Sequence, residues 1–347
     1  MRALRLTGFD GPSELTVDDV DRPEPGPGEV LVGMEFAALN HFDLLLVTGR
    51  LAQRPPTPHV PGIEGAGTIV SVGAGVPEER VGERVTLYPY VGCRRCDFCL
   101  VGAYQVCRVG QVNTIGFLLP GTMSELVRAP ADNALHVPDG LSLEDAAAVS
   151  LAGMTALRLI SSARTPLMGK TVLVRAVASG VGSLVVQLVK AGGANTVIGT
   201  AGSQEKLTRA TDLGMDVGID HAAESVPARV KEITAGAGVD LVFDYVGAAT
   251  WDDDVRSLAR GGSLVLCGAH TGSNVGLDLW HVFAKELSII GSYGGSRQDL
   301  QRTLRLAASG LLRPVIDAVM PLDEAAVGFE RMQSRDHFGK ILFELGR

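Results

Sequence analysis

The feature that most constrains the fold is a regular alternation of apolar runs and amphipathic stretches after about residue 153. Strand-like and helical segments follow one another in this order: 171–177, 181–192, 195–201, 203–214, 239–247, 253–262, 263–269 and 287–295. Strands that alternate with helices in this way predict βαβ units and a parallel, doubly wound sheet. We therefore predict an α/β domain over residues 153–291.

The first 152 residues have a different pattern, in which short β-type runs are broken by proline and glycine. The runs cover residues 29–40, 66–73, 83–91 and 124–130. This pattern is typical of a turn-rich, mostly antiparallel sheet. The last stretch, residues 292–347, contains a helical pattern, an apolar run, a second helix and a closing strand at 339–345.

The composition narrows the class of protein. The formal net charge of −8 argues against a general affinity for nucleic acid or for an anionic membrane surface. The N-terminus shows no signal-peptide pattern, and no apolar stretch approaches the roughly 20 residues that span a bilayer. We expect a cytoplasmic protein with no nucleic-acid partner and no membrane anchor.

A strand, a glycine-containing turn and a helix over residues 171–194 predict a dinucleotide site. Gly180 and Gly182 lie at the turn, where small residues let the backbone approach a pyrophosphate beside the helix N-terminus. The strict G-x-G-x-x-G is absent, because Val177 and Ser179 occupy its first two glycine positions. A tight turn that binds nothing is the alternative, but the βαβ units that follow favour a cofactor.

The end of the next strand indicates which cofactor is used. NAD-binding proteins usually place Asp or Glu there to bond the ribose 2′-hydroxyl. Here the sequence has Thr200, Ser203 and Lys206 instead, with Arg209 as a further cation. Because no carboxylate repels a 2′-phosphate and Ser203 and Lys206 can donate to one, we predict NADPH. The alternative is that Lys206 belongs to a solvated helix face.

Four cysteines form a cluster with the spacing C-x2-C-x2-C-x7-C. They are Cys93, Cys96, Cys99 and Cys107. Two-residue gaps let successive thiolates face one ion, and four thiolates close a tetrahedral zinc shell that leaves no position for substrate. We predict one structural Zn²⁺; an iron–sulfur cluster, or free or disulfide-bonded cysteines, are the alternatives. Cys267 lies in an apolar run and is interpreted as a core thiol.

Together these features resemble the medium-chain dehydrogenase/reductase superfamily of zinc-type alcohol dehydrogenases and quinone oxidoreductases. The resemblance covers essentially the whole chain, including segments 62–76, 243–247 and 337–345. It implies a GroES-like β-rich catalytic domain over 1–152 with a zinc lobe near 91–110. It also implies a Rossmann domain over 153–291, a return to the catalytic domain over 292–347, and a homodimer joined through the edge strand near residue 290.

The family's second, catalytic zinc has no matching ligand set in this chain. The three ligand positions hold Asn40, Ile63 and Leu151, and His41 with Asp43 and Glu64 is an incomplete set. The segment LNHFDLLL is similar to the branch that lacks the catalytic zinc. That resemblance implies an NADPH-dependent reductase of quinones or α,β-unsaturated carbonyls. A zinc-independent alcohol dehydrogenase or carbonyl reductase is the first alternative, and a non-catalytic NADPH-binding protein is the second.

The resemblance also assigns residues to roles. Asn40, His41 and Thr155 are the expected donors or neighbours of the reacting groups, and Asp43 and Glu64 lie near the vacated metal position. Packed or capping roles are the alternatives for Asn40, His41 and Glu64. The residues expected to bind the cofactor are Ser179, Gly180, Val181, Gly182, Thr200, Ser203, Lys206, Val246, Gly247, Gly268, Ala269 and Lys340.

Overall fold

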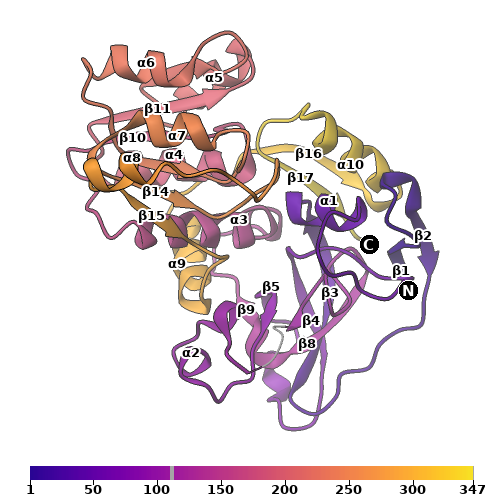
Figure 1. Ribbon diagram of the computed structural model, residues 1–347. Coiled ribbons are helices and arrows are strands. Elements are labelled where there is room, and N and C mark those ends of the chain that lie inside the picture. Colours follow the sequence, from indigo (N-terminus) through magenta and orange to yellow (C-terminus); the bar gives the residue numbers. More distant parts are fainter. Residues whose placement is uncertain (110–112, 347) are drawn as a thin grey trace. The chain divides into compact units, whose positions relative to one another are not determined.

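The computed structural model describes residues 1–109 and 113–346, so residue 110 of the predicted zinc lobe lies outside the described residues. The chain divides into two compact units, Met1–Met154 with Gly295–Arg347, and Thr155–Gly294. The first division falls within helix α3 (Leu143–Ser162). Figure 1 shows both units and labels many of their helices and strands. Among the described residues, no helix has the length and apolar character needed to cross a membrane.

The first unit is built on a seven-stranded, mostly antiparallel sheet, as predicted. Its strand order is β16-β17-β3-β4-β5-β9, with β8 also paired to β3. Glycine permits the tight packing of the sheet, because a Cβ at Gly67 would lie 2.0 Å from the carbonyl oxygen of Gly33. The strands of this unit are β1 (Arg2–Leu6), β2 (Leu15–Asp19), β3 (Glu29–Ala38), β4 (Gly65–Val72), β5 (Arg84–Leu87), β6 (Tyr90–Val91), β7 (Asn113–Thr114), β8 (Leu126–Pro130), β9 (Ala134–His136), β16 (Ile316–Pro321) and β17 (Lys340–Glu344).

Helices complete the first unit. Helix α9 begins at a capping box, in which the Ser296 hydroxyl accepts from the backbone N–H of Asp299 and the Asp299 carboxylate accepts from that of Ser296. The core of the unit contains Leu4, Val32 and Phe343, all at most 1% exposed. Besides α3, its helices are α1 (His41–Val47), α2 (Asp97–Leu100), α9 (Arg297–Ala308) and α10 (Ala325–Ser334), with short 3-10 turns at Pro12–Glu14, Glu78–Arg80, Tyr104–Val106, Ala131–Asn133 and Leu322–Glu324.

The second unit is a parallel six-stranded sheet with helices packed on it, which confirms the predicted Rossmann architecture. The strand order is β12-β11-β10-β13-β14-β15 and every pairing in it is parallel. Leu173, Ile198 and Val242 are fully buried, which explains the continuous apolar runs. The strands are β10 (Thr171–Val174), β11 (Thr196–Ala201), β12 (Val217–Asp220), β13 (Val239–Asp244), β14 (Leu258–Leu266) and β15 (Ser288–Gly291), and the helices are α4 (Gly180–Ala191), α5 (Gln204–Thr211), α6 (Val226–Ile233), α7 (Trp251–Ser257) and α8 (Leu279–Ala284).

The sequence pattern was wrong at one boundary of this sheet. Residues 253–262 were expected to be helical, but α7 ends at Ser257 and β14 begins at Leu258. Leu258 pairs with Val239 and is 2% exposed, so tertiary burial extends the strand. The pairing register of β13 with β14 shifts between Val239 and Leu241. The backbone of β14 passes close to Gly238, since a Cβ there would lie 2.7 Å from the Ala259 nitrogen.

Candidate functional site

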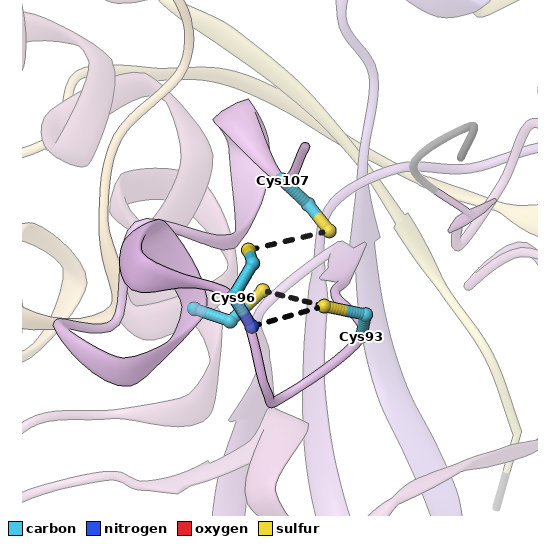
Figure 2. A group of neighbouring side chains, drawn as sticks. Cys93, Cys96 and Cys107 are labelled. Atoms are coloured by element: carbon cyan, nitrogen blue, oxygen red, sulfur yellow. Dashed lines mark hydrogen bonds between the residues drawn. The ribbon is translucent and has the colours of Figure 1, made fainter. Parts of the chain in front are cut away.

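The four cysteines lie together in the first unit. Cys96 is the N-cap residue of α2, Cys99 lies within that helix, and Cys107 follows the turn Tyr104–Val106. The Sγ atoms of Cys93 and Cys99 are 3.9 Å apart, as are those of Cys96 and Cys107, and all four lie within 4.8 Å of one another. Figure 2 shows the Sγ atoms of Cys93, Cys96 and Cys107 turned toward one another.

These distances fit one tetrahedral zinc. Zn–S bonds of about 2.3 Å place the sulfurs of a tetrahedron about 3.8 Å apart. Glycine makes room for the lobe, because a Cβ at Gly92 would lie 2.6 Å from the Cys99 Sγ. Backbone N–H donors, chiefly from Arg108, lower the pKa of Cys96 to about 6. Burial raises the pKa of the Cys99 thiol, so a bound cation is what would hold all four residues as thiolates.

A buried ionic network occupies the place where the sequence predicts the vacated catalytic metal. The Lys340 ammonium donates to Glu64 Oε2 at 2.7 Å, to Asn40 Oδ1 at 2.8 Å and to the Leu39 carbonyl oxygen at 2.8 Å. Lys340 is 3% exposed and Glu64 is fully buried. All three N–H donors of the ammonium are therefore satisfied within the first unit.

Glu64 connects this network to the middle of α3. Its Oε1 accepts from the Ser150 hydroxyl at 3.2 Å and from the backbone N–H groups of Leu151 at 2.5 Å and Ala152 at 3.2 Å. One carboxylate thus connects the segments of Asn40, Ile63 and Leu151, the three positions at which the sequence resemblance implies the ligands of a catalytic zinc. Ile63 is 3% exposed and supplies no ligand atom.

The side chain of Asn40 is fully engaged. Its Nδ2 donates to the Ala38 carbonyl oxygen at 3.0 Å and to Glu64 Oε2 at 2.9 Å, while its Oδ1 accepts from Lys340. The backbone N–H of Asn40 donates to Asp43 Oδ2 at 2.9 Å, which fixes the start of α1. With both amide hydrogens used, the role of Asn40 as an oxyanion donor stays a prediction that this arrangement does not favour.

Two further predicted residues flank the network. Asp43 is fully buried, and burial raises the pKa of its carboxyl to about 7. His41 is half-buried and its ring centroid lies 6.3 Å from that of His337. Within the residues that the structure describes, the cysteine quartet is the only group of three or more His, Cys, Asp or Glu with ligand atoms close enough for one metal.

The second unit brings the predicted dinucleotide turn to one edge of its sheet. The Ser179 hydroxyl caps α4 by accepting from the Gly182 N–H at 3.0 Å. A Cβ at Gly182 would lie 2.3 Å from the Ala176 carbonyl oxygen, so only glycine fits there. The first N–H groups of α4, from Gly180 and Val181, have no partner within the helix and can receive a phosphate. The turn therefore fits the group predicted from the sequence.

The other predicted cofactor residues of this unit lie at the ends of neighbouring strands. Asp244 ends β13 and accepts from the backbone N–H groups of Val246 at 2.9 Å and Gly247 at 3.0 Å. A Cβ at Gly247 would lie 2.7 Å from the Ala269 Cα, so the ends of β13 and β14 pack closely. Since parallel strands share one carboxyl edge, these residues lie at the same edge as the turn.

The remaining predicted cofactor residues differ in their surroundings. Ser203 is the N-cap residue of α5, and its hydroxyl accepts from the Lys206 N–H at 3.4 Å. Thr200 is 2% exposed, and its Oγ1 accepts from the Ala176 N–H at 3.3 Å. This hydrogen bond holds the backbone at the start of the dinucleotide turn. Lys340 belongs to the first unit, and its assignment to the cofactor stays a prediction.

An ion pair that the sequence does not predict lies at the end of β10. Arg175 follows β10, is 1% exposed, and its Nε lies 2.5 Å from Asp254 Oδ1 of α7. The Tyr245 hydroxyl donates to the Arg175 carbonyl oxygen and would lie 2.4 Å from a Cβ at Gly182. The only sequence signal was an arginine directly after an apolar strand, and its acidic partner is 79 residues away.

Known families match both units of the chain. Residues 26–139 match the family described as "Alcohol dehydrogenase GroES-like domain", and residues 180–309 match "Zinc-binding dehydrogenase". An alcohol dehydrogenase of Geobacillus stearothermophilus is 32% identical over 99% of this chain and 100% of its own length. An acryloyl-coenzyme A reductase of Metallosphaera sedula is 31% identical over 94% of this chain and 95% of its own.

Solved structures agree with this assignment. The crystal structure of an NAD-dependent alcohol dehydrogenase is 37% identical, with a TM-score of 0.93 over 100% of both chains. The fold, the cysteine quartet and the dinucleotide turn are the features on which the sequence resemblance rested. This chain therefore belongs to the medium-chain dehydrogenase/reductase superfamily of zinc-type alcohol dehydrogenases and is an oxidoreductase of that family.

Proposed function

We propose that this oxidoreductase interconverts a carbonyl compound and its reduced form without a catalytic zinc. The observation that carries the proposal is the buried Lys340 ammonium. It donates hydrogen bonds to Asn40 and Glu64, which are residues that a catalytic metal at this place would need as ligands. A lysine ammonium and a zinc ion do not share one small site, because the two cations repel each other strongly in a low-dielectric interior. Ile63 and Leu151 add no ligand atom to the site.

Without a catalytic metal, the cofactor and the protein side chains must together carry out the hydride and proton transfers. A bound nicotinamide supplies or accepts the hydride. Negative charge develops on the substrate oxygen during reduction, and hydrogen-bond donors must hold it. We assign that role to His41, since both amide hydrogens of Asn40 are engaged, and the role of Thr155 stays the prediction made from the sequence. Asp43, whose pKa burial raises to about 7, can hold a proton near neutral pH.

Two substrate classes fit this proposal. Alcohol–carbonyl interconversion, the first alternative of the sequence analysis, is supported by relatives named alcohol dehydrogenases, which outnumber the others in the comparison. Reduction of a conjugated C=C bond is the second candidate, supported by relatives named acryloyl-coenzyme A reductases. Conjugation activates the hydride acceptor, which suits a site without a Lewis acid.

A substrate screen tests the function. We expect the purified protein to oxidise NADPH with aldehydes, ketones, enones, enoyl thioesters or quinones, at a rate that strong chelators leave unchanged while the lobe zinc is retained. The rates for a saturated aldehyde and for an enone with the same carbon skeleton show which of the two substrate classes the protein prefers. Chelator-sensitive oxidation of simple alcohols, together with a second zinc per chain, would refute the metal-free proposal. No turnover with any of these compounds would favour a non-catalytic role.

We propose NADPH as the preferred cofactor, because Ser203 and Lys206 replace the ribose carboxylate. The substitution Lys206→Ala should weaken NADPH binding by about 1.5–3 kcal/mol, since it removes one charge-assisted contact to the 2′-phosphate. NADH affinity should barely change, which fluorescence titration of both cofactors will measure. Thr208→Ala, at an exposed position of the same helix, is the control. Equal losses for both cofactors would show that Lys206 does not contact the 2′-phosphate.

We also propose a homodimer joined through the second unit. Strand β15 lies at one end of the sheet order, so one side of its backbone has no neighbouring strand within the described residues. Leu279, Trp280 and Phe283 of α8 are 68%, 73% and 58% exposed. An open edge and exposed aromatic residues are typical of a surface that a second copy covers. Sedimentation velocity, which gives the particle mass, will decide between monomer and dimer.

A further inference from the structure

The second unit contains a pocket that the cofactor turn does not use. It is an open depression of about 750 Å³ beside α6, between the loop 236–238, the end of α7 and the start of β14. Known small-molecule sites have volumes of a few hundred to about 1,000 Å³. Val230, Ala237 and Leu258 give it an apolar part. The pocket is therefore large enough for a small metabolite with a short apolar body.

Four cations line this pocket and no carboxylate does. They are Lys231, Arg256, Arg260 and Lys285. Within the described residues none of the four takes part in an ion pair of 4.0 Å or less; Lys285 Nζ donates to the Leu258 carbonyl oxygen at 3.0 Å and Arg260 Nη1 to that of Ala284 at 2.8 Å. Burial, and then the neighbouring Arg260, lower the pKa of Lys285. These four positive charges lie together in a chain whose formal net charge is −8.

The pocket is separate from the cofactor site. It borders Gly238 and Leu258, which lie at the starts of β13 and β14, whereas the cofactor residues follow the carboxyl ends of the same strands. Strand β13 has six residues, and a strand rises about 3.3 Å per residue, so the two edges are about 20 Å apart. A dinucleotide bound at the turn does not explain the four cations.

We propose that this pocket binds a small molecule with two or more negative charges, of the class of phosphorylated or polycarboxylate metabolites. Four like charges that face one cavity repel one another, and a multivalent anion removes that repulsion. Arginine guanidinium groups offer paired N–H donors that match phosphate and carboxylate oxygens. The apolar part holds the carbon skeleton of the ligand. This inference does not depend on the proposed reaction.

Calorimetric titration with inorganic pyrophosphate tests the pocket. The protein is kept in an excess of NADPH well above its dissociation constant, so that the dinucleotide turn is filled. We expect one pyrophosphate per chain at low ionic strength, with an affinity that falls as salt is added. The double variant Arg256→Gln/Arg260→Gln should weaken this binding about tenfold or more, because two charge-assisted contacts are lost. Its affinity for NADPH should stay unchanged.

A matched control carries the same change of charge elsewhere. Arg302→Gln/Arg305→Gln replaces two exposed arginines of α9 in the first unit and should leave pyrophosphate binding unchanged. Thermal melting gives a second measurement: pyrophosphate should raise the melting temperature of wild type and of the control, but not of the pocket variant. The single variant Lys231→Gln, on an exposed helix face, replaces the double variant if that one fails to fold. Absence of pyrophosphate binding, or equal weakening by the control, would overturn the proposal.

Discussion

The substitution Cys96→Ser should release the lobe zinc and destabilise the first unit more than any other single change considered. Four Sγ atoms within 4.8 Å of one another form a closed shell, and loss of one thiolate opens it. Structural zinc contributes on the order of 10 kcal/mol to the folding of small zinc domains, because the site does not exist in the unfolded chain. Because one shell of four thiolates holds one ion, elemental analysis should find about one zinc per wild-type chain. It should find clearly less zinc in the variant.

Calorimetry of the same two proteins should show a lower melting temperature for Cys96→Ser. The control is Cys267→Ser, which changes a half-buried thiol of the second unit and should leave the zinc content unchanged. Two zinc ions per wild-type chain would contradict the assignment of a single structural site. Zinc retained in full by Cys96→Ser would show that the four cysteines do not form the shell.

The substitution Lys340→Met should cost about 3–5 kcal/mol of unfolding free energy, because it leaves the Glu64 carboxylate buried without its cation. Glu64 is fully buried and lies 2.7 Å from the Lys340 ammonium. Glu64→Gln should be destabilising for the converse reason, since it leaves a buried ammonium with neutral acceptors only. Urea unfolding monitored by circular dichroism will give each value.

The double variant Lys340→Met/Glu64→Gln separates charge pairing from packing. It removes both charges together, so its loss of stability should be clearly smaller than the sum of the two single losses. Simple additivity would show that the two groups do not interact in the folded protein. The double variant also tests the prediction that Lys340 contacts the cofactor, since an unchanged dissociation constant for NADPH would exclude such a contact.

Local sequence was enough to predict the zinc lobe and the dinucleotide turn. Cys93, Cys96 and Cys99 are three residues apart, so the geometry of one turn brings their thiolates together. The turn before α4 depends on the close approach at Gly182 and on the Ser179 cap, both within a few residues. Alternation of strands and helices likewise predicted the parallel sheet, because hydrophobic periodicity reports burial directly.

Tertiary structure decided the features whose partners are distant in the sequence. Lys340 lies 276 residues from Glu64 and 300 from Asn40, and nothing in the final strand indicates that its ammonium reaches the end of β3. The Arg175–Asp254 pair joins a strand end to a helix 79 residues away. The earlier start of β14 has the same origin, since burial of Leu258 against β13 extends the strand into residues with a helical pattern. Short-range spacing in the sequence determines local geometry. The partner of a buried charge is determined by tertiary packing, which excludes water and brings one opposite charge within hydrogen-bonding distance.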